Sequence, residues 1–201
     1  MKEETGGFAS RGGLKLDHAL REFGLDVAGL VCADFGCSTG GFTDCLLKRG
    51  AARVYAVDTA YGQLAWTLRN DPRVVVMERT NALHAPRPKD APGGVGLVVI
   101  DASWTPQRLV IPAALRWLKP GGRIVSLVKP HYELKDRGGK LPRGGVLEEP
   151  EAERIARGVA EGLGAFGVRV TGLTKSPILG GKGNAEWVIG LEEVPPSERA
   201  D

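Results

Sequence analysis

Four ionisable residues have types and settings that suit shared chemistry: Lys15, Asp101, Lys129 and Glu186. Lys15 lies in SRGGLKLDHAL, Asp101 ends the apolar run VGLVVID, Lys129 ends IVSLVK, and Glu186 lies in GGKGNAEWVIG. Two lysines held near two carboxylates can tune one amine towards neutrality, and a neutral amine can take the proton of a weakly acidic hydroxyl. We therefore predict that the fold gathers these four residues into one catalytic site.

Strands and helices must position these four residues, and the sequence predicts that the two kinds of element alternate along the chain. Short apolar, β-branched runs alternate with helical patterns, which predicts an α/β fold with a mostly parallel seven-stranded sheet and helices on both faces. We expect strands at 30–34, 53–58, 74–77, 95–101, 123–129, 168–174 and 185–191, and helices at 14–23, 42–48, 63–69, 105–119 and 150–166. A short glycine-rich turn joins the last two strands, so we expect an antiparallel last strand.

The segment after Pro130, HYELKDRGGKLPRGGV, has no clean period and is predicted to be a mobile loop beside the site. We expect residues 1–193 to form a single domain, because 201 residues suffice for one core, and residues 194–201 to form a frayed tail.

Composition excludes several protein classes. The hydrophobic content of 42% with 25% charged residues is ordinary for a soluble globular protein. The net charge of +3 permits a polyanionic partner without requiring one. Three cysteines without a CxxC pair, and three histidines that form no cluster, argue against a metal site or a disulfide framework. No signal peptide or run of ~20 apolar residues is present, so we expect a cytoplasmic chain without membrane contact.

A glycine-rich turn, DFGCSTGGFTD, joins the first predicted strand to the next helix. Glycines allow close approach of a ligand to the main chain, and the helix start offers free N–H groups. Asp58 ends the next strand, where a carboxylate can accept both hydroxyls of a ribose. The spacing G-x-x-x-G-G disfavours a nicotinamide cofactor, whereas the turn and the acid together suit S-adenosylmethionine. Asn81 is placed to contact an adenine edge, and turn capping is an equal alternative.

With these segments placed, the sequence resembles the FtsJ-like ribose 2′-O-methyltransferases, and within them the TlyA branch, often labelled hemolysin-like. The matching stretches are SRGGLKLDHALREFGLDV, DFGCSTGGFTDCLLKRGAARVYAVD, YGQLAWTLRNDPRVVVMERTNA, LVVIDASW, PGGRIVSLVKP and SPILGGKGNAEWVI. The resemblance implies a Rossmann-like fold that uses S-adenosylmethionine and methylates ribosomal RNA, at a cytidine ribose in the TlyA branch. The family's Lys-Asp-Lys-Glu tetrad falls on Lys15, Asp101, Lys129 and Glu186. Its cofactor contacts fall on Gly36, Ser38, Gly40, Gly41, Phe42, Asp58 and Asn81.

The sequence also departs from the TlyA pattern. TlyA-like chains usually carry an N-terminal RNA-binding module, whereas this sequence starts almost at the Lys15 segment. We therefore expect either that the chain positions RNA by itself or that a partner protein replaces the module. Ala-Ser-Trp follows Asp101 in place of the Val-Ser-Phe expected there, and His-Tyr-Glu follows Pro130 in place of Gln-Phe-Glu. Both changes flank predicted catalytic residues and bear on which nucleotide fits.

The nucleophile limits the implied reaction, since a ribose hydroxyl is weakly acidic. We expect Lys129 to act as the general base or as the direct hydrogen-bond partner of the hydroxyl. Free lysine has a pKa of about 10.4, and a second cation, Lys15, with partial burial would lower it. Asp101 is expected to orient Lys129 and to lie beside the sulfonium, and Glu186 to hold Lys15 or the ribose.

RNA contacts are expected from cations on loops. The predicted RNA-binding residues are Arg11, Lys135, Arg137, Lys140 and Arg143, which can neutralise phosphates without reading sequence. A merely solvated loop is the alternative for the last four. Trp104 and Tyr132 are candidates for stacking on a base.

Three other functions compete with this interpretation. A nicotinamide-dependent oxidoreductase is disfavoured by the missing G-x-G-x-x-G. A module that binds cofactor and associates with RNA without catalysis is the main alternative. Membrane damage, which the hemolysin label suggests, finds no basic amphipathic helix or long apolar segment in the sequence.

Overall fold

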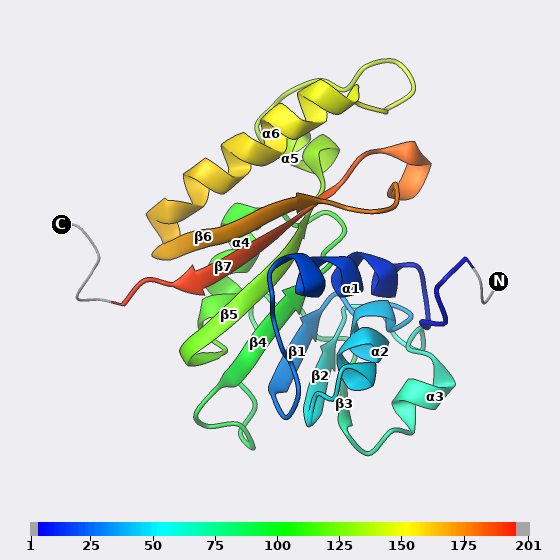
Figure 1. Cartoon of the computed structure of the whole chain (residues 1–201), viewed down its shortest axis with the longest axis vertical. Helices are drawn as coiled ribbons and strands as arrows, with labels where there is room; N and C mark the ends of the chain where they lie inside the picture. Colours follow the sequence, from blue (N-terminus) through cyan, green and yellow to red (C-terminus); the bar gives the residue numbers. More distant parts are fainter. Residues whose placement is uncertain (1–3, 196–201) are drawn as a thin grey trace.

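One mixed sheet of seven strands organises the computed structural model, which describes residues 4–195 (Figure 1). The strands are β1 (Val31–Phe35), β2 (Arg53–Val57), β3 (Val74–Met77), β4 (Val95–Ile100), β5 (Leu118–Val128), β6 (Val168–Lys175) and β7 (Trp187–Glu193). Their spatial order is β3-β2-β1-β4-β5-β7-β6. The first five strands pair in parallel, and β7 runs antiparallel to both β5 and β6. The predicted α/β fold with an antiparallel last strand is therefore confirmed.

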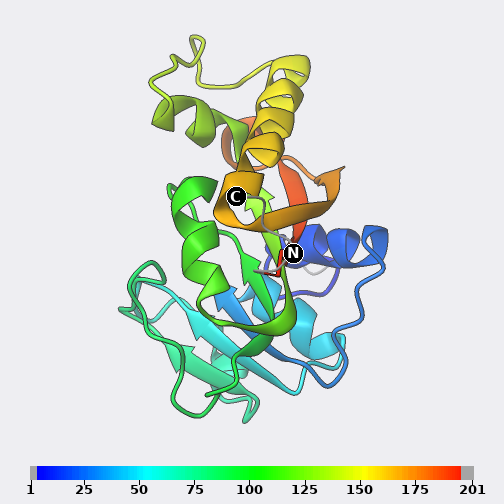
Figure 2. The same ribbon diagram turned by 90° about the vertical axis from the view of Figure 1, so that its left-hand side faces the viewer.

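Helices cover both faces of this sheet (Figures 1 and 2). They are α1 (Gly12–Glu22), α2 (Gly41–Lys48), α3 (Trp66–Arg69), α4 (Gln107–Leu115), α5 (Pro130–Asp136) and α6 (Glu149–Gly162), with short 3-10 turns η1 (Leu163–Phe166) and η2 (Gly181–Gly183). Within residues 4–195 no helix is both long and apolar enough to cross a membrane.

Successive side chains of β4 point to opposite faces of the sheet, and both faces are covered by helices. Val99 packs in a core cluster with Leu16 and Leu46 from α1 and α2. The adjacent Val98 points to the other face and packs in a cluster with residues of α4 and α6 such as Ile155. A strand buried on both faces must be apolar throughout, which is why VGLVVI reads as a continuous run.

The strand order reverses beside β1, because the chain passes from β3 at one edge back to β4. In open α/β sheets a ligand crevice lies at such a reversal, beyond the carboxyl ends of the strands. The turn at 36–41 follows β1 there, and Asp101 follows β4. The topology therefore brings two predicted site segments together at one edge.

The predicted loop after Pro130 is wrong in its first half, where the chain forms α5. Pro130 occupies the first turn of this helix, a position that its fixed φ suits. The carboxylate of Glu133 is buried and accepts a hydrogen bond of 2.9 Å from the Gln107 N–H at the start of α4. A helix of seven residues shows too few turns for a readable period, so a tertiary contact decides its formation.

Smaller differences concern the ends of elements. The helix expected from residue 63 begins at Trp66, and the helix expected to reach Phe166 passes into η1 after Gly162. Strand β5 begins at Leu118, and the Pro-Gly-Gly expected as a turn lies inside it. The connection between β6 and β7 spans residues 176–186 and contains η2, so it is longer than the predicted short turn. Most of the predicted frayed tail, residues 196–201, lies outside the described residues, and the single-domain boundary stays a prediction.

Candidate active site

Two ion pairs join the four predicted catalytic residues, and Lys15, Asp101 and Lys129 line cavities at the crevice. Lys15 Nζ donates a hydrogen bond of 2.6 Å to Glu186 Oε2, and both side chains are largely buried. Lys129 Nζ lies 2.6 Å from Asp101 Oδ1 in an ion pair whose angles do not make a hydrogen bond. Each lysine therefore has its own carboxylate. The structure contains both contacts, while the catalytic roles of the four residues stay predictions.

Glu186 reaches Lys15 because of the segment that precedes β7. Gly180 lies so close to the Glu186 carboxylate that a Cβ at position 180 would collide with Glu186 Oε1. The main-chain oxygen of Glu186 accepts a hydrogen bond of 2.8 Å from the Ser176 N–H. The glycine-rich connection between β6 and β7 is thus one wall of the site.

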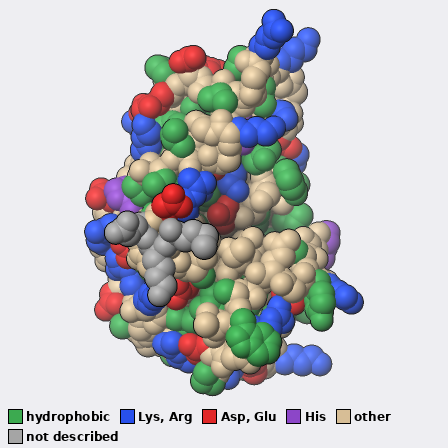
Figure 3. All heavy atoms as spheres, turned by 90° about the vertical axis from the view of Figure 1, so that its right-hand side faces the viewer, with side chains coloured by type: hydrophobic (Ala, Val, Ile, Leu, Met, Phe, Trp, Pro, Cys, Tyr) green, Lys and Arg blue, Asp and Glu red, His purple; other side chains and the backbone are tan. Residues whose placement is uncertain are grey.

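Two adjoining cavities meet at this place. The smaller, about 240 Å³, is lined by Arg11, Lys15 and Gly180 among others. The larger, about 530 Å³, is lined by Asp58 and Lys129 among others. Gly36, Ser38 and Asp101 line both cavities. Figure 3 shows this side of the molecule hollowed at its centre, with acidic side chains in the hollow and Lys or Arg side chains beside it.

The turn after β1 is shaped by close main-chain contact. Gly36 has a φ of +85°, and a Cβ there would lie 2.6 Å from the carbonyl oxygen of Asp101. Ser38 also lies in the left-handed region, at φ +46°, which is uncommon for a non-glycine residue. Gly40, with φ +95°, precedes Gly41 and Phe42 in the first turn of α2. Of these predicted cofactor residues, Gly36, Ser38, Gly41 and Phe42 line the smaller cavity.

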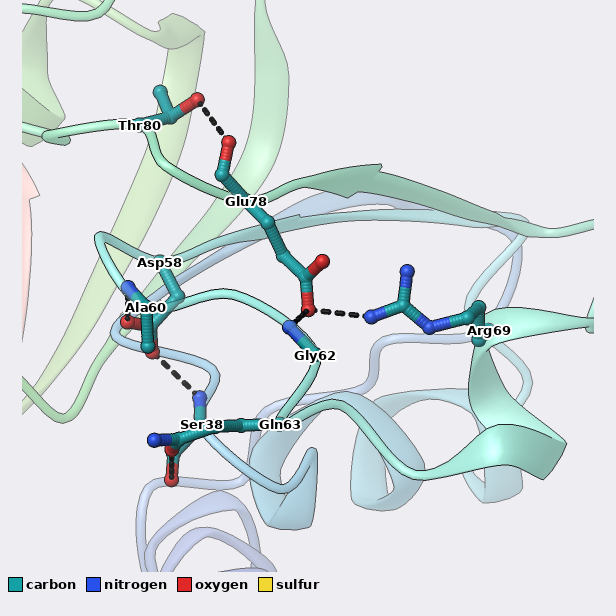
Figure 4. A network of polar contacts seen from close by, with 8 residues as sticks. All are labelled: Ser38, Asp58, Ala60, Gly62, Gln63, Arg69, Glu78 and Thr80. Atoms are coloured by element: carbon teal, nitrogen blue, oxygen red, sulfur yellow. Dashed lines mark hydrogen bonds and ion pairs between the residues drawn. The ribbon is translucent and has the colours of Figure 1, made fainter.

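Asp58 holds the left-handed Ser38 in place (Figure 4). Its Oδ2 accepts a hydrogen bond of 2.7 Å from the Ser38 N–H, and its Oδ1 accepts one of 2.8 Å from the Ala60 N–H. The carboxylate is therefore oriented by main-chain donors, and each oxygen keeps a second lone pair for a ligand hydroxyl.

The same network continues away from the cavity. Glu78 accepts hydrogen bonds from the Gly62 N–H and from Arg69. Desolvation acts to raise the pKa of Glu78, but these hydrogen bonds and the Arg69 charge together hold it below its usual value. These contacts fix the segment between β2 and α3 that carries Gln63 to the Ser38 hydroxyl.

Asn81 lines the larger cavity, and its Oδ1 accepts a hydrogen bond of 3.0 Å from the Leu83 N–H. This contact is the turn-capping role that the sequence offered as an alternative. The position in the cavity is also compatible with contact to a base.

The residues at the cavity walls fit S-adenosylmethionine. The larger cavity has carboxylates at Asp58 and Asp101, and Lys129 is paired with Asp101. An oriented carboxylate suits a ribose diol, and a second carboxylate suits a positively charged sulfonium. The close-packed glycine turn offers main-chain groups to the amino-acid part.

Asp34 is a buried acid that the sequence did not single out. Thr43 Oγ1 donates a hydrogen bond of 2.6 Å to Asp34 Oδ2, and Oδ1 has no hydrogen-bond partner among the described residues. Burial raises the pKa of Asp34 to about 7, and the nearby Asp101 and Asp58 carboxylates add to the rise. A neutral carboxyl group therefore underlies the cofactor turn at weakly acidic pH.

The five predicted RNA-binding residues are all exposed. Arg11 lines the smaller cavity at the start of α1. Lys135 lies in α5, and Arg137, Lys140 and Arg143 follow in the segment 137–147, which we call the basic loop. Lys and Arg side chains project from the top of the molecule in Figure 3, where Figure 1 places this loop. The basic loop is thus separate from the Arg11 position in the chain and in space.

Two aromatic residues stand at the larger cavity. Trp104 lines it with 78% of its surface exposed, and its ring centroid lies 5.8 Å from that of Tyr132. His131 is buried beside Tyr132; desolvation, with Lys129 and other lysines nearby, lowers the pKa of His131. The Trp104 ring is therefore not part of the hydrophobic core.

Sequence reasoning missed the wall formed by Ile178, Gly180 and Gly181. The signal for it was the run GGKGN just before Glu186, which was interpreted only as a turn between strands. Asp34 was hidden because a polar residue at the end of an apolar strand is ordinary next to a turn.

Comparisons with known proteins point to one family. The model of the FtsJ-like methyltransferase family matches residues 8–193. The 16S/23S rRNA (cytidine-2′-O)-methyltransferase TlyA of Mycobacterium tuberculosis is 45% identical over 92% of this chain and 68% of its own length. YqxC of Bacillus subtilis, a candidate rRNA methyltransferase, is 42% identical over 92% of this chain and 65% of its own. The chain thus spans about two thirds of the length of these relatives.

A solved structure from Streptococcus thermophilus, described as a candidate hemolysin, superposes with a TM-score of 0.85 at 41% identity. The superposition covers 93% of this chain and 67% of that one. The fold therefore has a close parallel among solved structures.

Proposed function

The chain belongs to the FtsJ-like methyltransferase family, and we propose that it transfers the methyl group of S-adenosylmethionine to a ribose 2′-hydroxyl of ribosomal RNA. The observation that carries this proposal is the pair of lysine–carboxylate contacts, Lys15–Glu186 and Lys129–Asp101, on cavities that share Asp101. The name of the tuberculosis relative supports a cytidine as the target nucleoside. Such a substrate places the protein with ribosomes in the cytoplasm and requires no membrane.

The larger cavity holds the cofactor in this proposal. S-adenosylmethionine, when bound, supplies a methyl group on a positively charged sulfonium. Asp58 accepts the ribose hydroxyls, since its two oxygens are already aimed by the Ser38 and Ala60 N–H groups. Asn81 lies at the adenine end, and the turn from Gly36 to Phe42 contacts the amino-acid part.

Lys129 is the group that contacts the target hydroxyl. It acts either as the base that takes the proton or as the hydrogen-bond partner that aligns the oxygen. Asp101 Oδ1 lies 2.6 Å from Lys129 Nζ and orients this side chain at the cavity; in the base role the neutral amine takes the hydroxyl proton and becomes an ammonium that Asp101 stabilises. Lys15 and Glu186 close the opposite wall and hold the ribose in line, and alignment of the reacting atoms supplies much of the acceleration.

RNA is held by charge and by stacking. Arg11 at the smaller cavity and the cations of the basic loop contact phosphates on two sides of the site. The exposed Trp104 stacks on the target base, because an aromatic face at the cavity mouth can hold a base that has left its helix. A partner protein that adds affinity for the ribosome is compatible with these contacts.

The deciding experiment is methylation of defined RNA. Purified protein is incubated with S-adenosylmethionine carrying a labelled methyl group and with unmodified ribosomal subunits or their deproteinised RNA. We expect label in RNA, mapped by mass to one nucleoside and located on the ribose by resistance of the next phosphodiester to alkaline cleavage.

Two results would contradict the proposal. Cofactor binding without label in any RNA would favour the non-catalytic module. Label on a base, with the phosphodiester still cleaved by alkali, would refute ribose methylation. A thermal-shift comparison of S-adenosylmethionine with NAD tests the cofactor separately.

A further inference from the structure

Asn184 joins the basic loop to the connection between β6 and β7, two segments that are far apart in the sequence. It is 1% exposed and lies between η2 and β7, two residues before Glu186. Its Nδ2 donates a hydrogen bond of 3.1 Å to the carbonyl oxygen of Gly145. Its Oδ1 accepts a hydrogen bond of 3.1 Å from the Leu147 N–H. Both ends of the amide thus contact the end of the basic loop.

The basic loop depends on this contact for its conformation. Gly144 and Gly145 are both left-handed, at φ +98° and +76°, and such consecutive residues have a large conformational freedom to lose. Leu147 is buried, whereas Arg143 and Gly144 are exposed. The Asn184 side chain is therefore an anchor for a stretch whose own side chains mostly face solvent.

The main chain of Asn184 faces the catalytic wall. Its carbonyl oxygen accepts a hydrogen bond of 2.8 Å from the Gly180 N–H, which closes a turn over residues 180–184. Gly180 in turn lies against the carboxylate of Glu186, the partner of Lys15. One residue therefore connects the segment that carries the loop cations to the Lys15–Glu186 pair.

We propose that Asn184 is a positioning residue that fixes the basic loop relative to the Lys15–Glu186 pair. When the loop binds RNA phosphates, this fixed position places the target ribose next to Lys129. This inference rests on the proposed function. It goes beyond that function because it assigns a role to a residue that needs no contact with RNA or cofactor.

The test is a double-substitution cycle on RNA methylation. Asn184→Ala removes the anchor, Arg143→Ala removes a loop cation, and the third variant carries both. We expect Asn184→Ala to raise the KM for RNA about fivefold to tenfold, with kcat changed less than about twofold. Arg143→Ala is expected to raise KM in the wild-type background and to have almost no further effect beside Asn184→Ala, because an unanchored loop no longer places its cations.

Controls separate positioning from general loss of structure. Asn70→Ala removes an exposed asparagine whose Nδ2 donates a hydrogen bond of 2.7 Å to a main-chain oxygen far from the loop, and it should leave KM unchanged. The Kd for S-adenosylmethionine should stay at the wild-type value in all variants. Amide hydrogen exchange should accelerate at Leu147 in Asn184→Ala.

A second variant covers the case in which Asn184→Ala folds poorly. Asn184→Ser keeps a small polar side chain that can satisfy one main-chain partner, but its single hydroxyl is too short to bridge the Gly145 carbonyl and the Leu147 N–H. We expect the same rise in KM from it, with thermal stability closer to wild type.

Each outcome has a definite meaning. Additive effects of the two substitutions, or a loss in kcat at unchanged KM, would overturn the positioning role while the wild-type activity stands. Absence of methylation by the wild-type protein would instead overturn the proposed function, and this inference would fall with it.

Discussion

The proposed cofactor side and the proposed RNA side of the site, called the cofactor side and the RNA side below, are built in different ways. On the cofactor side, the turn 36–42 and Asp58 are separated by a short stretch of chain, and main-chain N–H groups orient the Asp58 carboxylate. On the RNA side, contacts join segments far apart in sequence, such as Lys15 with Glu186 and Asn184 with the basic loop. The cofactor side is therefore shaped by local main-chain geometry, whereas the RNA side is shaped by packing between segments that are distant in sequence.

This difference indicates which side tolerates change. A cofactor of constant shape can be met by a preformed turn, whereas RNA must be placed by elements whose relative positions set the reaction geometry. Substitutions on the cofactor side should therefore change one binding constant, and substitutions on the RNA side should change alignment and affinity for RNA together.

The strongest test of this division is Lys129→Ala, at the border between the sides. We expect kcat for RNA methylation to fall about 10³-fold, because the contact with the target hydroxyl is lost. The Kd for S-adenosylmethionine, measured by calorimetry, should change little. Lys119→Ala, at the other end of β5, is the matched control and should keep full activity. A wild-type rate for folded Lys129→Ala would remove Lys129 from the mechanism.

Asp34 tests whether the cofactor side has its own pH dependence. Its folded-state pKa of about 7 lies above the ordinary aspartate value of about 4, so the folded chain holds a proton that the unfolded chain has released between these values. Its contribution to stability is complete below about pH 4 and is lost as pH rises through about 7.

We therefore compare the free energies of unfolding of Asp34→Asn and wild type, measured with urea. As pH rises from 5 to 8, the difference should shift by about 2 kcal/mol in favour of Asp34→Asn. The exposed Asp26, whose Oδ1 accepts a hydrogen bond from the Ala28 N–H, supplies the control Asp26→Asn, which should show no such trend. Parallel pH curves for Asp34→Asn and wild type would show that Asp34 is ionised in the folded protein.

Asp58→Ala should affect the cofactor side alone. We expect the Kd for S-adenosylmethionine to rise about 30-fold, because charge-assisted hydrogen bonds to the ribose are lost and Ser38 loses its main-chain partner. Binding of RNA in the absence of cofactor serves as the internal control and should be unchanged. Equal losses in both affinities would mean that the two sides are not separable.

Neutralising the basic loop should affect the RNA side alone and produce the smallest change. We expect Lys140→Ala with Arg143→Ala to weaken RNA binding about tenfold and to reduce the slope of log Kd against log salt by about 1.5. The matched control is Arg154→Ala with Arg157→Ala on α6, where both arginines pair with glutamates one turn away. An unchanged salt slope would show that the loop cations are only solvated.

Sequence patterns sufficed to predict those parts of the fold that are set by residues close together in the chain. The seven strands and the glycine turn follow from apolar runs and from glycine placement, which depend on neighbours in the chain. Helix α5 was missed because its formation depends on Glu133 meeting the start of α4. The raised pKa of Asp34 was also beyond the sequence, since it comes from complete burial.

The amino-acid order by itself determined the fold class, the strand ends that face the crevice and the candidate lysines and carboxylates, because hydrophobic period and turn chemistry are local properties. Only the tertiary structure decided that Lys15 pairs with Glu186 across 171 positions, that two cavities share Asp101, and that Asn184 anchors the basic loop. Such contacts form between segments whose distance is set by packing of the whole sheet and its helices, and no local pattern encodes that distance.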